Sequence, residues 1–182
     1  MRHIKIIRSI SLIIAIFLIT SCSNNSAMKP EDFKNKEPRL IIEEYLTGNV
    51  KAWGVLQNRS GKVTRQFSAD LDGTWDGKQL ILKEKFNWDD GEVQNREWII
   101  NKIDENNYEG TAGDVVGKAK GYSYGPAFKF EYVLLVPVKG REMKITFDDW
   151  IFKQDERVAI NRATMTKFGI KVAELTVVFI KD

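Results

Sequence analysis

Apolar and polar side chains alternate along most of the sequence after Val50. In the segment VTRQFSADLDGTW the apolar residues recur at alternate positions and would share one face of a strand: Val63, Phe67, Ala69, Leu71 and Trp75. A period of two is typical of β-strands, whose successive side chains point to opposite faces. Turn signals such as Asp76-Gly77, Asp90-Gly91 and Lys139-Gly140 interrupt the alternation. The pattern therefore predicts antiparallel strands joined by hairpins.

One segment before these strands has a helical period instead. In EPRLIIEEYLTG, residues 37–48, Pro38 suits a first helical position and Gly48 suits a helix end. The apolar residues between them have helical spacing: Leu40, Ile41, Tyr45 and Leu46. The segment predicts one short helix ahead of the strands.

These elements together predict an all-β domain over residues 37–182. The turn signals delimit about eight to ten strands, and no helices alternate with them as a parallel sheet would require. The expected architecture is a lipocalin-like, calycin-type antiparallel meander barrel of eight to ten strands with one short N-terminal helix. The interior of such a barrel is filled by side chains or holds one small ligand.

The first residues have the pattern of an export signal. Three basic residues precede the apolar stretch 10–19, which as a helix would span about 15 Å, against about 30 Å for a bilayer core. The lone cysteine, Cys22, follows Ile19-Thr20-Ser21, and this arrangement resembles the lipobox of bacterial lipoproteins. We expect residues 1–21 to be a lipoprotein signal peptide and residues 22–36 a lipidated cysteine with a flexible tether. An ordinary secretory signal that leaves a free thiol is the alternative.

The same resemblance implies a location. Ser23 rather than aspartate follows the cysteine, which favours the bacterial outer membrane, with the periplasmic face expected before the cell surface. The membrane would then be a partner of the protein through the lipid on Cys22.

The charge balance of the remaining chain argues against nucleic-acid binding. Residues 1–21 contain three of the 28 basic residues and none of the 25 acidic ones, so the remainder carries 25 of each sign. A formally neutral domain gives no case for nucleic-acid binding, which requires a clustered basic face.

The predicted domain also lacks the usual nucleophiles and bases. The single histidine is His3 and the single cysteine is Cys22. Histidine-dependent triads, cysteine nucleophiles, disulfides and thiolate or imidazole metal sites are therefore excluded. No cofactor is expected. The run Asp89-Asp90-Gly91-Glu92 lacks the spacing of a calcium loop and is interpreted as a solvated turn.

Several charged residues fall on strand faces that are otherwise apolar. Three arginines are expected to meet three carboxylates inside the barrel or at its opening: Arg65, Arg96 and Arg162 with Glu84, Asp114 and Asp149. Buried charges are costly unless they are paired. Three interpretations remain open: a structural ion-pair network, an arginine that binds the carboxylate or phosphate head of a lipid, or Glu84 and Asp149 as the acid and base of a glycan hydrolase.

The tryptophans are interpreted mainly as core residues, because aromatic side chains dominate buried area. Trp88 and Trp150 are candidates for the wall of an apolar cavity, and Trp98 and Arg96 are expected beside the barrel interior.

The glycine-rich stretch GTAGDVVGKAKGYSYG, residues 110–125, suggests a phosphate-binding loop at first sight. Such a loop precedes a helix, and no helix is predicted here. Glycines between strands instead indicate bends, bulges or a close approach to the backbone. The alternative is that the thin wall lets a ligand lie against the backbone.

Four blocks of the sequence together resemble one family: AWGVLQNRSGKVTRQF, DLDGTWDGKQLILKEKFNWDDGEVQNREW, YEGTAGDVVGKAKG and FDDWIFKQDERVAINRATMTKFG. They are similar to the bacterial lipoprotein family known as domain of unknown function 3833, over residues 32–182. The family has no established activity; the fatty-acid-modifying enzymes encoded beside its members imply lipid handling. The word Gly73-Thr74-Trp75 also resembles a lipocalin signature, although it closes the second predicted strand.

The function expected from these observations is non-catalytic binding of a lipid or other apolar ligand by an outer-membrane lipoprotein. A fatty acid or phospholipid is the expected ligand. A structural or interaction module of the envelope with a filled barrel is the first alternative, and a carboxylate-dependent hydrolase is the second.

Overall fold

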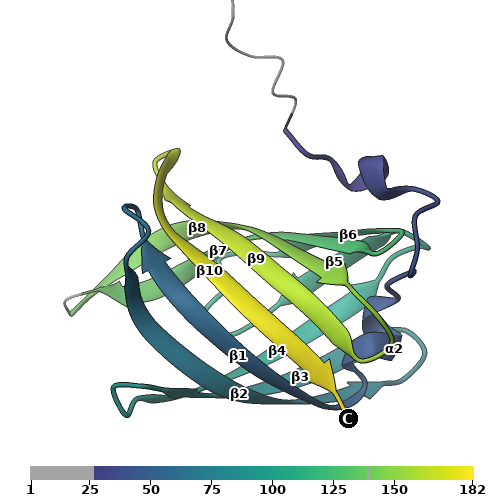
Figure 1. The fold of residues 1–182 in the computed structure, drawn as a ribbon, viewed down its shortest axis with the longest axis horizontal. Coiled ribbons are helices and arrows are strands. Elements are labelled where there is room, and N and C mark those ends of the chain that lie inside the picture. Colours follow the sequence, from purple (N-terminus) through teal and green to yellow (C-terminus); the bar gives the residue numbers. More distant parts are fainter. Residues whose placement is uncertain (1–26, 139) are drawn as a thin grey trace, which may run out of the picture.

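The computed structural model describes residues 27–138 and 140–182, which form a closed antiparallel barrel (Figure 1). Each strand pairs with its neighbours in the chain, and the last pairs with the first. The strands are β1 (Gly48–Asn58), β2 (Val63–Trp75), β3 (Gln79–Trp88), β4 (Val93–Lys102), β5 (Asn107–Thr111), β6 (Ala119–Tyr124), β7 (Ala127–Val138), β8 (Arg141–Lys153), β9 (Val158–Lys167) and β10 (Ile170–Lys181). The predicted all-β meander barrel is confirmed, with ten strands. Among the described residues no helix has the length and apolarity to cross a bilayer.

The alternation in the sequence becomes the inside and outside of the barrel. In β2, Phe67, Ala69 and Leu71 are at most 6% exposed, whereas Ser68 and Asp70 between them are solvent-exposed. Successive side chains of a strand must point to opposite faces, so one apolar stripe for each strand is enough to fill the interior.

The predicted hairpin turns lie where the sequence places them. Gly77 between β2 and β3 and Gly91 between β3 and β4 have φ of 97° and 87°, a region that glycine enters without steric cost. Asp76 fastens the first of these turns, because its Oδ1 accepts hydrogen bonds from the backbone N–H groups of Lys78 and Gln79 at 2.8 and 2.7 Å.

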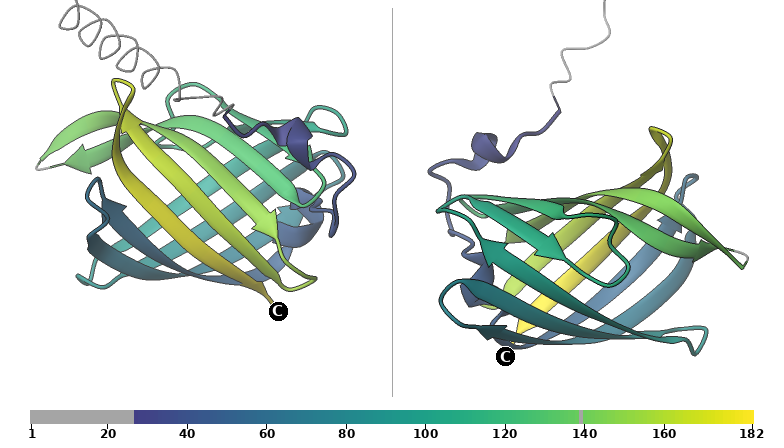
Figure 2. Two further views of the ribbon diagram at one scale, coloured as in Figure 1. Left: turned by 45° about the horizontal axis from the view of Figure 1, so that its top comes forward. Right: turned by 180° about the vertical axis from the view of Figure 1, so that it is seen from behind.

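A short helix closes one end of the barrel (Figures 1 and 2). Helix α2 spans Ile42–Leu46, and it begins four residues later than the position of Pro38 predicted. Tyr45 and Leu46 are buried against the strands, and the Tyr45 hydroxyl donates a hydrogen bond to the carbonyl of Arg157 at 2.9 Å. We call this the closed end.

The opposite end, which we call the mouth, is formed by the other set of strand connections. These are residues 59–62, 89–92, 112–118, the turn at Gly140, and 168–169. The connections alternate between the two ends because every pair of neighbouring strands is antiparallel.

Part of the predicted tether is folded against the barrel. Residues Pro30–Phe33 form the 3₁₀-helix η1, and the Phe33 ring lies 5.9 Å from the Trp150 ring and 5.5 Å from the Phe152 ring, measured between centroids. The apolar Phe33 side chain provides this contact within an otherwise polar segment. The predicted signal peptide and Cys22 lie outside the described residues.

The glycine-rich stretch is a place of close approach, as one interpretation predicted. A Cβ at Gly110 would lie 2.5 Å from the Phe130 ring, and one at Gly121 would lie 2.9 Å from the Phe128 ring. The barrel interior thus presses its own aromatic rings against the backbone of β5 and β6.

Gly73 provides a test of how α2 seals the closed end. A Cβ added at Gly73 would lie 1.9 Å from the backbone oxygen of Leu46, which cannot move without shifting the helix. We expect Gly73→Ala to lower the free energy of unfolding by about 1–3 kcal/mol, measured by urea denaturation. Gly113→Ala is the control, because nothing lies within 4 Å of that Cβ position and its φ is ordinary. Equal stability of the two variants would contradict this account of the seal.

Candidate functional site

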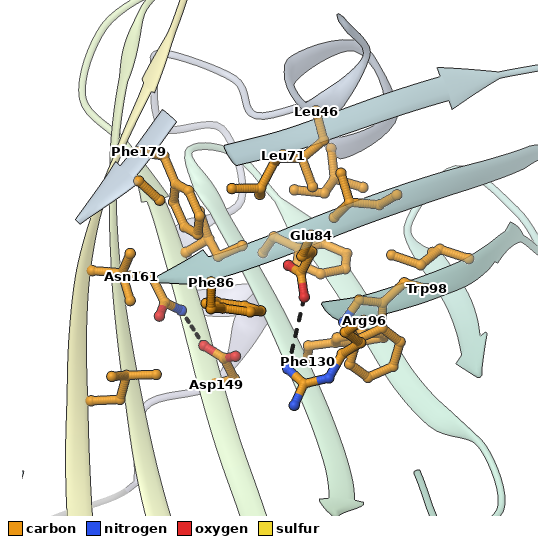
Figure 3. Close-up of a pocket in the computed structure, with 18 of the residues that line it drawn as sticks. Leu46, Leu71, Glu84, Phe86, Arg96, Trp98, Phe130, Asp149, Asn161 and Phe179 are labelled. Carbon is orange, nitrogen blue, oxygen red and sulfur yellow. Dashed lines mark hydrogen bonds and ion pairs between the residues drawn. The ribbon is translucent and has the colours of Figure 1, made fainter. Parts of the chain in front are cut away.

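An interior cavity of about 100 Å³ lies between α2 and the strands. Most of its wall is apolar, including Phe86, Trp98 and Phe130. Figure 3 shows Glu84 and Arg96 side by side on neighbouring strands and joined by an ion pair, with Asp149 and Asn161 joined to each other on other strands of the wall. The site is therefore an apolar chamber with one polar group of side chains.

Arg96 links two of the predicted carboxylates. Glu84 and Arg96 are directly opposite each other on β3 and β4, and Arg96 Nη1 lies 3.7 Å from Glu84 Oε2. Arg96 also donates to Asp114 through Nη2 at 2.8 Å and through Nε at 3.1 Å. Only 15% of the Arg96 side chain is exposed, so the pairing with carboxylates offsets the cost of burying its charge.

Asp114 lies in a segment that covers a gap between β4 and β5 in the barrel wall. β4 pairs with β5 only between Ile99 and Lys102, so the half of β4 nearer the mouth has no β5 partner. Residues 112–118 cover this gap: the N–H of Val116 donates to the carbonyl of Val133 at 2.8 Å, and the N–H of Leu135 donates to that of Asp114 at 2.9 Å. The Arg96–Asp114 contact joins this covering segment to β4.

Glu84 is the least satisfied polar group of the cavity. Its side chain is 12% exposed, and Oε2 is buried without a hydrogen-bond partner in the described structure. Burial raises the pKa of Glu84 to about 7, and the nearby carboxylates Asp149 and Asp114 add to this effect while Arg96 opposes it. The carboxyl group can therefore change its protonation state near neutral pH.

Asp149 has hydrogen-bond partners instead of an arginine. The Tyr132 hydroxyl donates to Oδ2 at 2.9 Å, and the Asn161 amide donates to Oδ1 and to the backbone carbonyl of Trp150, the latter at 3.1 Å. Burial raises the pKa of Asp149, and these hydrogen bonds moderate the rise. Burial also raises the pKa of Tyr132 far above its usual range, so its hydroxyl keeps its proton and acts as a donor.

Comparison with known families shows the family to which this chain belongs. Residues 16–181 match the family described as "Protein of unknown function (DUF3833)". The chain belongs to this family. A search among curated proteins finds no match.

Solved structures share the fold of this DUF3833 chain. The S-type phycobiliprotein lyase CPES from Guillardia theta superposes with a TM-score of 0.57 at 11% identity, over 77% of this chain and 90% of the lyase. A protein of unknown function from the DUF3598 family of Nostoc punctiforme gives 0.58 at 13% identity, over 81% of this chain and 51% of its own, so the chain spans about half of it. At these identities the similarity concerns the fold, which is a lipocalin-like, calycin-type barrel.

Two of the predicted arginines lie outside the cavity of the DUF3833 barrel. Arg65 pairs at the mouth with Asp90 at 2.7 Å and Glu92 at 2.8 Å. The Arg162 side chain is 67% exposed and lies 3.8 Å from Glu174, its one ion-pair contact among the residues that the structure describes. The prediction that these two arginines pair with Glu84, Asp114 or Asp149 is therefore wrong, although Arg65 does lie at the barrel opening. Arg65 lies near the start of β2, close enough to reach the turn between β3 and β4. Arg162 lies on the outer face of β9 because its neighbour Asn161 points inward.

Two predicted cavity tryptophans are also elsewhere. Trp150 is buried on the outside of β8 beneath Phe33, because Asp149 before it points inward. Trp88 packs near the mouth, with its ring 4.0 Å from the Arg65 guanidinium and 4.9 Å from the Phe67 ring. Trp98 does line the cavity.

The acidic turn between β3 and β4 is an ion-paired turn. Arg65 binds two of its carboxylates, Asp90 and Glu92. In the described part of the chain, no group of three or more His, Cys, Asp or Glu side chains could hold a metal ion.

Sequence reasoning missed two side chains of the site, Tyr132 and Asn161. The Tyr132 ring packs against the Phe130 ring in β7, and the alternation of apolar residues does not predict that its hydroxyl contacts Asp149. Asn161 is only 4% exposed, and it lies between the buried small residues Ala159 and Ala163. A polar residue between two small apolar ones was the available signal.

The raised pKa of Glu84 predicts a pH-dependent stability. The unfolded chain ionises this carboxyl near pH 4.5 and the folded chain only near pH 7, so the free energy of unfolding falls as the pH rises through this window. We expect Glu84→Gln to match the wild type at pH 4.5 and to exceed it by up to about 3 kcal/mol at pH 8, measured by urea denaturation.

The control for this experiment is Glu97→Gln, an exposed position on the same strand as Arg96. It should change stability by less than about 0.5 kcal/mol at either pH. A constant difference between Glu84→Gln and the wild type across this pH range would show that Glu84 ionises normally.

Proposed function

We propose that this barrel binds a small single-chain amphiphile, with its polar head near Glu84 and Arg96, and that it performs no catalysis. The observation that carries the proposal is the buried Oε2 of Glu84, which has no hydrogen-bond partner although it borders the cavity. Leaving such a group unpaired costs about 1–3 kcal/mol. A hydroxyl or amine donor on a ligand would remove that cost.

The size of the cavity limits the ligand. Ligand sites usually enclose about 300–1,000 Å³, whereas this cavity measures about 100 Å³, room for roughly three water molecules. A bound molecule must therefore extend toward the mouth. A second apolar cluster there includes Leu134, Ile145 and Phe147, with the partly buried Met143 and Met165 packed against it. Methionine side chains adapt readily, and one acyl chain is easier to admit than the two of a phospholipid.

The proposal rests on the cavity and not on the similar structures. The phycobiliprotein lyase shares only the fold at 11% identity, and folds of this kind serve unrelated functions. Enzymes that modify fatty acids are encoded beside members of this family, and this association agrees with an acyl ligand.

The proposed location follows from the N-terminal sequence. Lipidation of Cys22 would anchor the protein in the bacterial outer membrane, with its barrel in the periplasm. This anchor is supported by the lipobox resemblance.

A structural role with a filled barrel is the second candidate, and the small cavity volume favours it. A hydrolase that uses Glu84 and Asp149 is less well supported. Such enzymes keep one carboxylate ionised while raising the pKa of the other, whereas burial raises the pKa of both here.

Ligand binding can be tested by native mass spectrometry of protein purified from its own host, followed by titration with decanol and decanoic acid. We expect a bound amphiphile in the wild type and loss of binding in Val177→Phe, which fills the cavity from β10. Thr176→Phe is the control, because the neighbouring side chain points to the outer surface.

Two results would reject this function. One is the absence of both a co-purified molecule and probe binding in the folded wild type, which would support the structural role. The other is equal loss of binding in Val177→Phe and Thr176→Phe.

A further inference from the structure

Most of the large apolar side chains that are exposed among the described residues lie around the mouth of the barrel. Nine large apolar side chains are exposed among the described residues, and three of these lie elsewhere: Met28, Trp53 and Ile103. The other six surround the mouth: Val63, Val93, Val116, Val138, Phe168 and Ile170. Scattered apolar side chains on a surface are ordinary, but their concentration at one end indicates an interaction site.

Phe168 is the most exposed of them. Its side chain is 93% exposed at the tip of the β9–β10 hairpin, and its φ is 51°. An aromatic residue is unusual in this left-handed region, where asparagine or glycine fits with less strain. Neither burial nor turn geometry explains a phenylalanine at this position, so we interpret its exposed ring as part of an interaction surface.

Positive charge surrounds this ring. The β1–β2 and β9–β10 hairpins lie side by side, because β1 pairs with β10 (Figure 1). Their end segments, 58–64 and 165–173, contain no acidic residue and four basic ones: Arg59, Lys62, Lys167 and Lys171. The Lys167 ammonium lies 5.3 Å from the centre of the Phe168 ring, and Lys171 contacts Glu174 at 3.1 Å.

Several acidic groups at the mouth are already paired. Arg65 binds Asp90 and Glu92, and Arg96 binds Asp114. Of the four hairpin cations, Lys171 is paired with Glu174, whereas Arg59, Lys62 and Lys167 form no salt bridge with any described residue.

We propose that the mouth docks on the surface of an anionic lipid bilayer, with Phe168 and Ile170 entering the interface and the hairpin cations binding lipid headgroups. Apolar tips flanked by lysine and arginine suit such a surface, because the rings enter the acyl boundary while the cations stay at the headgroups. A protein partner would more often require a continuous apolar patch with packed complementarity. Here the apolar side chains are spread over separate hairpin tips.

The path of the N-terminal segment agrees with this orientation. Phe33 lies against Phe152, near the closed end of β8. Ala27 and Met28 line a groove on the outer surface with Thr164, further toward the mouth. Cys22, the predicted lipidation site, precedes Ala27 by five residues, a span of at most about 17 Å. A lipid there would hold the mouth close to the membrane.

The inference concerns the outer rim and goes beyond the proposed ligand site. Its test needs no ligand, so failure of cavity binding and failure of docking can be distinguished. If both proposals hold, docking would place the mouth of the ligand-binding barrel against the lipid bilayer.

The test is co-sedimentation with vesicles of phosphatidylglycerol and phosphatidylethanolamine, compared with vesicles of phosphatidylcholine alone. The protein is the chain from Ser23 onward, which contains the whole closed barrel and lacks the cysteine; circular dichroism verifies its fold. We expect binding to the anionic vesicles that weakens with added salt. We expect Phe168→Asn to bind at least about fivefold more weakly, and asparagine suits the turn, so the variant should fold.

The matched control is Ile103→Asn, which removes an exposed apolar side chain, 58% exposed, from the closed end. It should bind as the wild type does. Absence of binding to anionic vesicles, or equal binding by Phe168→Asn and Ile103→Asn, would overturn the proposal.

Discussion

Everything in this structure depends on the pairing of the first strand with the last. β1 and β10 pair along nine residues, from Val50 opposite Lys181 to Asn58 opposite Ala173. Without this pairing, two strand edges would expose unpaired N–H and C=O groups, and the sheet would have no interior. Closure satisfies those groups. It also assigns every side chain to the inside or the outside, because the period of a strand is two.

Closure also creates the electrostatic character of the site. Glu84, Arg96 and Asp149 are polar residues on inward-facing positions of three strands, so the barrel places them in a common low-dielectric interior. Each is then stabilised differently. Arg96 pairs with carboxylates, Asp149 accepts hydrogen bonds, and Glu84 has an ion-pair contact with Arg96 but leaves Oε2 without a hydrogen bond. An apolar core would avoid the free-energy cost of burying these polar groups. Their retention in the cavity therefore supports a binding role.

The two ends of the barrel are chemically different. At the closed end, α2 packs its apolar face on the strands, and the backbone of Leu46 lies so close to Gly73 that a side chain there would clash. At the mouth, short hairpins present apolar and basic side chains to solvent. The helix therefore covers the closed end, and the proposed membrane contact lies at the other end.

The sequence by itself determined the fold class, the turns and the inner stripe of most strands. These features follow from local rules, namely the alternation in β2 and glycines such as Gly77 and Gly91 at turns with positive φ. It also indicated that arginines on apolar strand faces would meet Glu84, Asp114 or Asp149, and of the three arginines Arg96 does so, with Glu84 and Asp114.

Only the tertiary structure decided the rest. Arg65 pairs with a turn, Arg162 and Trp150 face outward, and Asn161 faces inward, although the sequence pattern did not distinguish these cases. A polar side chain near a strand end can reach solvent, and in β9 both faces carry apolar residues, so periodicity alone cannot say which face is inside. The pairing of distant strands makes that choice, because only one register of the closed barrel lets every strand bury its side chains together.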